Sequence, residues 1–167
     1  DQAGEHAAAL APAAGHVAFR WWLRNGTSNA LSNLRAQACV MLGRAAGFEV
    51  QTSTNKRLDG PLAAVRDASG RRWIITAWQG SARSWQNPPV PCIHSDPLLP
   101  DCPPGETREA RGWLWFYEGD RILDELARLR RDFLEDPPAA SQPRLEPIPD
   151  KLVVLSFDDS VASQFHH

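Results

Sequence analysis

The sequence lacks any apolar run long enough to cross a bilayer as a helix, which argues against a membrane-spanning helix. It also lacks a stripe of basic residues: 18 Lys and Arg stand against 20 Asp and Glu, and the two signs of charge are interspersed. Nucleic acids and anionic membrane surfaces are therefore poor candidates for partners. A nucleophile elbow, a P-loop and a dinucleotide-binding glycine pattern are missing too.

Cysteine is scarce, and three cysteines cannot form an even set of disulfides. Cys92 and Cys102 flank a proline-rich loop, so we predict a disulfide between them in an exported protein. Cys39 lies in an alternating apolar run over residues 34–42, and we expect it to be a buried, inert thiol. His94 and nearby aspartates add possible metal ligands, but their spacing matches no standard zinc pattern. A disulfide, or free thiols beside a hydrogen-bonded His94, is the favoured interpretation.

The first residues carry no initiator methionine and no charged segment before an apolar one. We therefore expect a processed product or an excised piece of a longer chain. With the predicted disulfide, a secreted or periplasmic location is the first expectation, and the cytoplasm stays open as the alternative.

Apolar and polar residues alternate in several stretches, which is the pattern of strands with one buried face. Residues 67–70 join two such stretches and predict a hairpin. Residues 34–42 alternate as well, although their alanine content leaves a helix open. Residues 79–107 hold seven prolines and predict a long loop without a continuous ladder. The side chains that we expect in the core are Phe19, Trp21, Leu23, Val40, Leu42, Ile75 and Leu114.

The pattern changes to that of a helix over residues 120–135, with Asp120 as the expected N-cap. Five prolines within residues 136–149 predict a semi-rigid linker. The fold class is therefore mainly β: an antiparallel β-sandwich, one helix, the linker, and the first strand of an α/β-barrel domain. The expected divisions are a loose lead-in (1–15), a β-sandwich-like accessory domain with its terminal helix (16–135), the linker (136–149) and the start of a truncated second domain (150–167).

Seven tryptophans are many for this length. Four of them lie within predicted strands, where a place in the core is the ordinary expectation. Trp78 and Trp85 lie at the edge of the long loop or within it. An exposed indole ring there can stack on the face of a sugar, so we predict Trp78 and Trp85 as candidate substrate-binding residues.

The chemically most informative segment is the apolar run over residues 151–157, which ends in Ser156-Phe157-Asp158-Asp159. This segment resembles the first motif of the polysaccharide deacetylase (NodB-like) family, in which a hydrophobic strand ends in Thr/Ser-Phe-Asp-Asp. The resemblance implies that Asp158 is the general base and that Asp159 binds a divalent metal, usually zinc. Ser160 stands where glycine often follows in that family, and a second motif of the form His-x-x-x-His would lie beyond residue 167.

The resemblance implies a carbohydrate-active hydrolase that removes acetyl groups from a polysaccharide or another acetylated glycan, with an N-terminal accessory β domain. It implies zinc in a full-length parent, while this chain alone is expected to be inactive and to bind no metal tightly. The alternative is a non-catalytic carbohydrate-binding or interaction module whose last strand completes its own sandwich. The pairing of residues 151–157 distinguishes the two interpretations.

Overall fold

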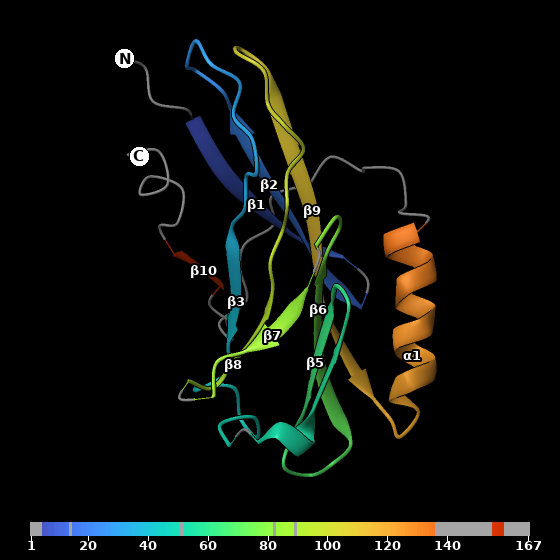
Figure 1. Cartoon of the computed structure of the whole chain (residues 1–167). Helices are drawn as coiled ribbons and strands as arrows, with labels where there is room; N and C mark the ends of the chain where they lie inside the picture. The colour runs from blue at the N-terminus through green and yellow to red at the C-terminus, as the bar shows by residue number, and fades with distance from the viewer. Residues whose placement is uncertain are drawn as a thin grey trace.

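Two antiparallel β-sheets and one α-helix make up the described part of the chain (Figure 1). The structure is a computed structural model, and it describes residues 5–13, 15–50, 52–81, 83–88, 90–135 and 155–158. The predicted mainly β class is confirmed. Over these ranges, no helix is both long and apolar enough to span a membrane.

The larger sheet has six strands in the order β1-β2-β9-β6-β5-β4, and the smaller sheet has four in the order β10-β3-β8-β7. A single 3₁₀ turn spans Ser53–Asn55, and α1 (Ile122–Leu129) continues as a π-helical turn over Arg130–Glu135. The strands are β1 (Glu5–Ala13), β2 (His16–Arg24), β3 (Gln37–Met41), β4 (Lys56–Asp59), β5 (Leu62–Arg66), β6 (Arg72–Trp78), β7 (Ser84–Gln86), β8 (Cys92–Ser95), β9 (Thr107–Glu118) and β10 (Leu155–Asp158).

The predicted lead-in over residues 1–15 is corrected by the structure. Glu5–Ala13 forms the edge strand β1, which pairs with β2 along its whole length. Gly15 has a φ of 78°, a left-handed conformation that suits the tight turn into β2. Alanine has a low strand propensity, so the composition of this segment does not predict a strand. Pairing with the long neighbour β2 determines its conformation.

The predicted long loop over residues 79–107 is also corrected, because it contains β7 and β8. Neither strand contains a proline. Pro91 immediately precedes β8, and Pro97 follows it closely. They limit β8 to four residues instead of preventing it. Residues 34–42, by contrast, contain the strand that their alternation predicted, β3, and not a helix.

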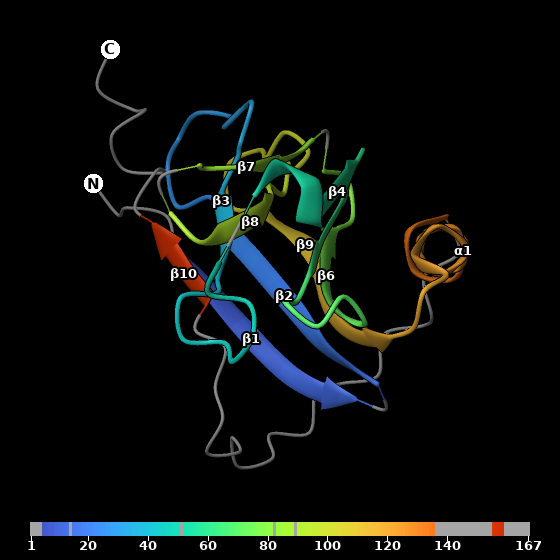
Figure 2. The same ribbon diagram turned by 90° about the horizontal axis from the view of Figure 1, so that it is seen from below.

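The main core lies between the two sheets (Figure 2). All seven side chains predicted for the core are buried, and six of them belong to this cluster. Trp78, on β6, packs against Phe19 with ring centroids 5.8 Å apart. Its ring also covers Gly112, where an added Cβ would lie 2.5 Å from the indole, so only glycine fits beneath it.

A second core lies on the other face of the six-stranded sheet, under α1 (Figure 1). The amphipathic helix buries Ile122, Leu126 and Leu129 against the sheet, as the spacing of these residues predicted. Stacked rings of Trp113 and Trp115 extend this cluster toward Phe133 and complete it. The six-stranded sheet is therefore covered on both faces.

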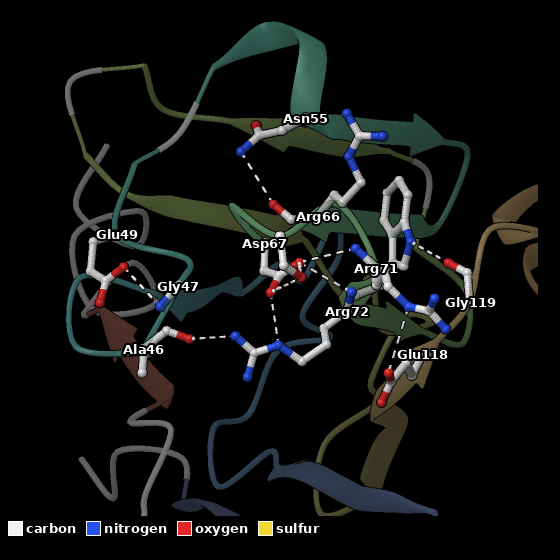
Figure 3. Close-up of polar contacts among 12 residues, drawn as sticks. Ala46, Gly47, Glu49, Asn55, Arg66, Asp67, Arg71, Arg72, Glu118 and Gly119 are labelled. Carbon is white, nitrogen blue, oxygen red and sulfur yellow. Dashed lines mark hydrogen bonds and ion pairs between the residues drawn. The ribbon is translucent and has the colours of Figure 1, made fainter.

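The hairpin between β5 and β6 is held by the carboxylate of Asp67, which is fully buried (Figure 3). Asp67 accepts hydrogen bonds from the Ser69 hydroxyl, from the backbone N–H of Arg72 and from the Arg72 guanidinium. Arg72 also donates to the carbonyl of Ala46, so it ties the 43–50 loop to the hairpin. Burial alone would raise the pKa of Asp67, but these hydrogen bonds outweigh it and hold the pKa well below its usual range.

Trp21→Ala should lower the free energy of unfolding by roughly 3–5 kcal/mol, because it empties an aromatic site in the main core. The measurement is equilibrium denaturation in urea. Trp22→Ala is the matched control, since Trp22 lies on the opposite face of β2 and is only half-buried. Losses of equal size in the two variants would contradict the assigned facing of β2.

Asp67→Asn should cost roughly 1–3 kcal/mol of stability at neutral pH, because buried donors lose their charged acceptor. The pKa of Asp67 is lower in the folded than in the unfolded chain, so its contribution is present above about pH 4 and declines as pH falls below that value. The variant should therefore show a flatter stability profile between about pH 4 and pH 2. Parallel profiles for the two proteins would contradict this role.

Candidate functional site

The smaller sheet brings three potential metal ligands together on the face that points away from the main core. Ala38, Val40 and Ile93 point into that core, so their neighbours in sequence lie on the other face of the sheet. Cys39 on β3 pairs directly with His94 on β8. Cys92 lies two residues before His94 and shares its face. We call these three residues the sulfur–imidazole cluster: Cys39, Cys92 and His94.

The donor atoms of the cluster are close enough to share one ion. All three lie within 4.8 Å of one another, one ligand atom from each residue. The Sγ of Cys92 and the Nε2 of His94 are 3.1 Å apart. Two donors bound to one tetrahedral zinc ion are roughly 3.5–4 Å apart, so only small side-chain movements separate this arrangement from a coordination shell.

Each member of the cluster is almost completely buried. Cys39 is 7% exposed, His94 is 4% exposed and Cys92 is 1% exposed. Burial removes competing water from the ligands of a metal ion. It also removes the space that a substrate would need to reach a catalytic thiol.

Asp96 organises the surroundings of His94. Its Oδ1 lies 4.0 Å from the Nδ1 of His94, on the side of the ring away from Cys92. The carboxylate itself is held by the indole N–H of Trp85 at 2.6 Å and by the backbone N–H of Ala38 at 3.3 Å. An ion pair with Arg83 at 3.5 Å completes its contacts. A carboxylate hydrogen-bonded to the far nitrogen is the usual outer partner of a metal-ligating imidazole, and at 4.0 Å Asp96 is near this position but outside hydrogen-bond distance.

The two tryptophans predicted to contact sugar differ in exposure. Trp78 is 1% exposed and lies in the main core, so it offers no ring face to a glycan and that prediction is corrected. Trp85 is half-buried on β7 and stacks on His94, with ring centroids 3.8 Å apart and 14° between the planes. Its main contact is therefore with the cluster, and one of its faces is already occupied.

The predicted disulfide is also corrected. Cys92 and Cys102 are described residues, and neither of them forms a disulfide. The backbone of Cys102 forms an isolated β-bridge with Leu31, and its thiol donates a hydrogen bond to the carbonyl of Glu106. Cys92 instead pairs with Met41 across the β3–β8 ladder. The two cysteines flank one loop in sequence, but opposite ends of that loop pair with different segments.

The electrostatic setting of the cluster includes one buried lysine. Lys56 on β4 is 6% exposed. Its burial lowers the pKa of the ammonium group, and the nearby Cys92 partly offsets this effect by attracting the positive charge.

Of the two aspartates in the deacetylase-like motif, only Asp158 falls among the described residues. Leu155–Asp158 forms β10, which pairs antiparallel with β3 at the edge of the smaller sheet. Asp158 lies opposite Gln37 and Ser156 lies opposite Cys39 in this register. Asp159, predicted as the metal ligand, lies outside the described residues, as do the linker over 136–149 and residues 159–167.

Sequence reasoning named Cys92 and His94 as possible ligands but favoured a disulfide or free thiols there, and it assigned Cys39 to an inert core position. The available signal was alternation: Cys39 and Met41 lie out of phase with the apolar residues of the same strand, as Cys92 and His94 do with Ile93. The pairing of the two strands was not predictable, because more than fifty residues separate them. Comparison with protein families, curated proteins and solved structures finds no match to this chain.

Proposed function

We propose that the β domain over residues 5–135 is a non-catalytic accessory module that holds one thiophilic metal ion in the sulfur–imidazole cluster. The observation that carries this proposal is the convergence of two cysteines and one histidine within 4.8 Å on a buried sheet face. Zinc is the divalent ion to test first, because thiolate and imidazole are its preferred protein ligands.

The chemistry of the donor set supports a metal ion over an inert core. Thiolates and imidazole are soft or borderline ligands, and their combination selects ions such as zinc and copper. The Nε2 of His94 is directed to Cys92, and the carboxylate of Asp96 lies 4.0 Å from the other ring nitrogen, so a small movement would give the imidazole an outer partner. These features all favour a metal ion, and a site that only packed side chains in a core would need none of them.

A thiol-based hydrolase is the rival chemistry, because Cys92, His94 and Asp96 follow one another like the members of a nucleophilic triad. The 3.1 Å contact between Cys92 and His94 would suit a nucleophile and its base. The burial of Cys92, at 1% exposure, leaves no approach for a carbonyl group. Metal binding is therefore the better supported function.

The role that we assign to the ion is structural. The β3–β8 ladder contains only three residue pairs, and so does the β7–β8 ladder. A metal that joins Cys39 to Cys92 and His94 would link the two central strands of this sheet. Its binding free energy would then add directly to the stability of the fold.

A second proposal concerns a longer protein that contains this chain. The segment Ser156-Phe157-Asp158-Asp159 supports polysaccharide deacetylase activity there, with an acetylated glycan as substrate and zinc as the metal. The pairing of β10 with β3 favours the alternative, a strand that completes the accessory module, because it gives these residues partners inside the same domain. A glycan contact by Trp85 would have to displace the Arg83 guanidinium, which lies 5.6 Å from the centre of the ring.

The purified protein should bind one zinc ion, and zinc at about 100 times its Kd should raise the free energy of unfolding by roughly 2.7 kcal/mol. Cys39→Ser and His94→Ala should each remove binding, because each deletes a ligand. The measurements are metal analysis after dialysis and thermal unfolding with and without a chelator. Cys102→Ser is the matched control, since Cys102 is equally buried but bonds elsewhere, and it should keep the metal. Equal zinc content in the Cys39→Ser variant and the wild type would contradict the proposal.

For the second proposal, Asp158→Asn in the longer protein should lower the deacetylation rate by about 10²- to 10⁴-fold, because a general base is lost. Metal content should stay unchanged, while Asp159→Asn should lower it. The assay follows acetate release from an acetylated glycan. Full activity with asparagine at position 158 would remove the basis of the deacetylase assignment.

A further inference from the structure

Met41 is the sole methionine of the chain, and it lies against the sulfur–imidazole cluster. Its Sδ is 3.3 Å from the Sγ of Cys39. Met41 also pairs with Cys92 across the β3–β8 ladder, while Cys39 pairs with His94. The four residues thus form a two-by-two arrangement on one face of the sheet, with two from each strand, and each of them carries a sulfur or imidazole donor.

This arrangement contains a ligand type that zinc does not use. Structural zinc sites are built from thiolate, imidazole and carboxylate ligands. A thioether is soft and neutral, and together with thiolates it selects monovalent copper. The Cys39–Met41 contact brings the thioether sulfur within 3.3 Å of one ligand atom of the proposed site.

We propose that Met41 is the fourth ligand of this site and that copper(I) is the ion it prefers. This inference rests on the proposed metal-binding function and adds the identity of the ion. The thiols of Cys39 and Cys92 lose their protons on binding, so two thiolates and one copper(I) ion leave a single negative charge.

The exposure of the four ligands agrees with this assignment. Cys39, Cys92 and His94 are buried, whereas Met41 is 36% exposed. The thioether therefore lies at the rim of the site, between the buried donors and solvent. An ion that arrives from solvent meets a flexible, neutral sulfur ligand before it reaches the thiolates.

Two simpler arrangements compete with this proposal. Met41 can act as an ordinary packing neighbour of Cys39, in which case it contributes nothing to metal binding. Cys39 and Cys92 occupy diagonal positions on paired strands, so oxidation to a disulfide would remove two ligands at once. Metal titration of variants distinguishes both arrangements from a four-ligand site.

The test compares copper(I) and zinc affinities of the full chain under anaerobic, reducing conditions. Copper(I) is titrated in competition with a chromophoric copper(I) chelator, and zinc in competition with a fluorescent zinc chelator. The wild type should bind one copper(I) ion. Met41→Leu should lower its copper(I) affinity by about tenfold or more and change the zinc affinity by less than about twofold, because only the soft thioether is lost.

Met41→Leu preserves side-chain volume at a partly exposed position, so the variant should fold, and its far-UV circular dichroism verifies this. Cys39→Ser should lose both ions, and Cys102→Ser should keep both. Wild-type copper(I) affinity in a folded Met41→Leu variant would overturn the role of Met41 and leave the metal site itself in place. Failure of the reduced wild type to bind either ion would overturn both proposals.

Discussion

The register of β3 against β8 is the constraint on which the candidate site depends. Side chains alternate between the two faces of a sheet, so a slip of one residue would move Cys39 and Met41 into the main core and expose Val40. In the observed register, Cys39 faces His94 and Met41 faces Cys92. One set of backbone hydrogen bonds therefore decides whether the sulfur and imidazole donors meet.

A ladder of three residue pairs is too short to hold this register by itself, and the surrounding structure fixes it. The Ser95 hydroxyl donates to the carbonyl of Pro61 at 2.6 Å and accepts the backbone N–H of Trp78, which attaches β8 to the larger sheet. Asp96 accepts the N–H of Ala38 and so spans the two strands directly. Burial of Val40 and Ile93 between the sheets penalises any slip, because a slipped strand would turn these side chains toward the outer face.

Much of the fold follows from local pattern. Alternation located β3, the turn at residues 67–70 located the β5–β6 hairpin, the helical period located α1, and every predicted core side chain is buried. The pattern failed where local preference and tertiary pairing disagree. The alanine-rich β1 is a strand because β2 offers it a partner, and β8 fits between prolines that were taken to exclude it. Trp78 was predicted to be exposed, but it occupies the space above Gly112, a contact between two strands far apart in sequence.

The site was predictable only in part for the same reason. Cys92 and His94 are close in sequence, and their residue types made them possible ligands, although their spacing matches no standard zinc pattern. Cys39 and Met41 come from a distant strand, and nothing in the sequence fixes the pairing of that strand with β8. The neighbouring Cys102 seemed the better partner for Cys92, yet it bonds with the segment around Leu31. Long-range pairing is the information that a single sequence does not display.

X-ray absorption spectroscopy of the metal-loaded protein tests the central claim most directly, because it reports the ligands around the ion. The account predicts a shell dominated by sulfur together with one imidazole nitrogen, with metal–sulfur distances of about 2.3 Å for zinc. A copper(I) sample should show one more sulfur than the same sample of the Met41→Leu variant. A shell of oxygen and nitrogen ligands without sulfur would contradict the account, because it would place the ion away from Cys39 and Cys92.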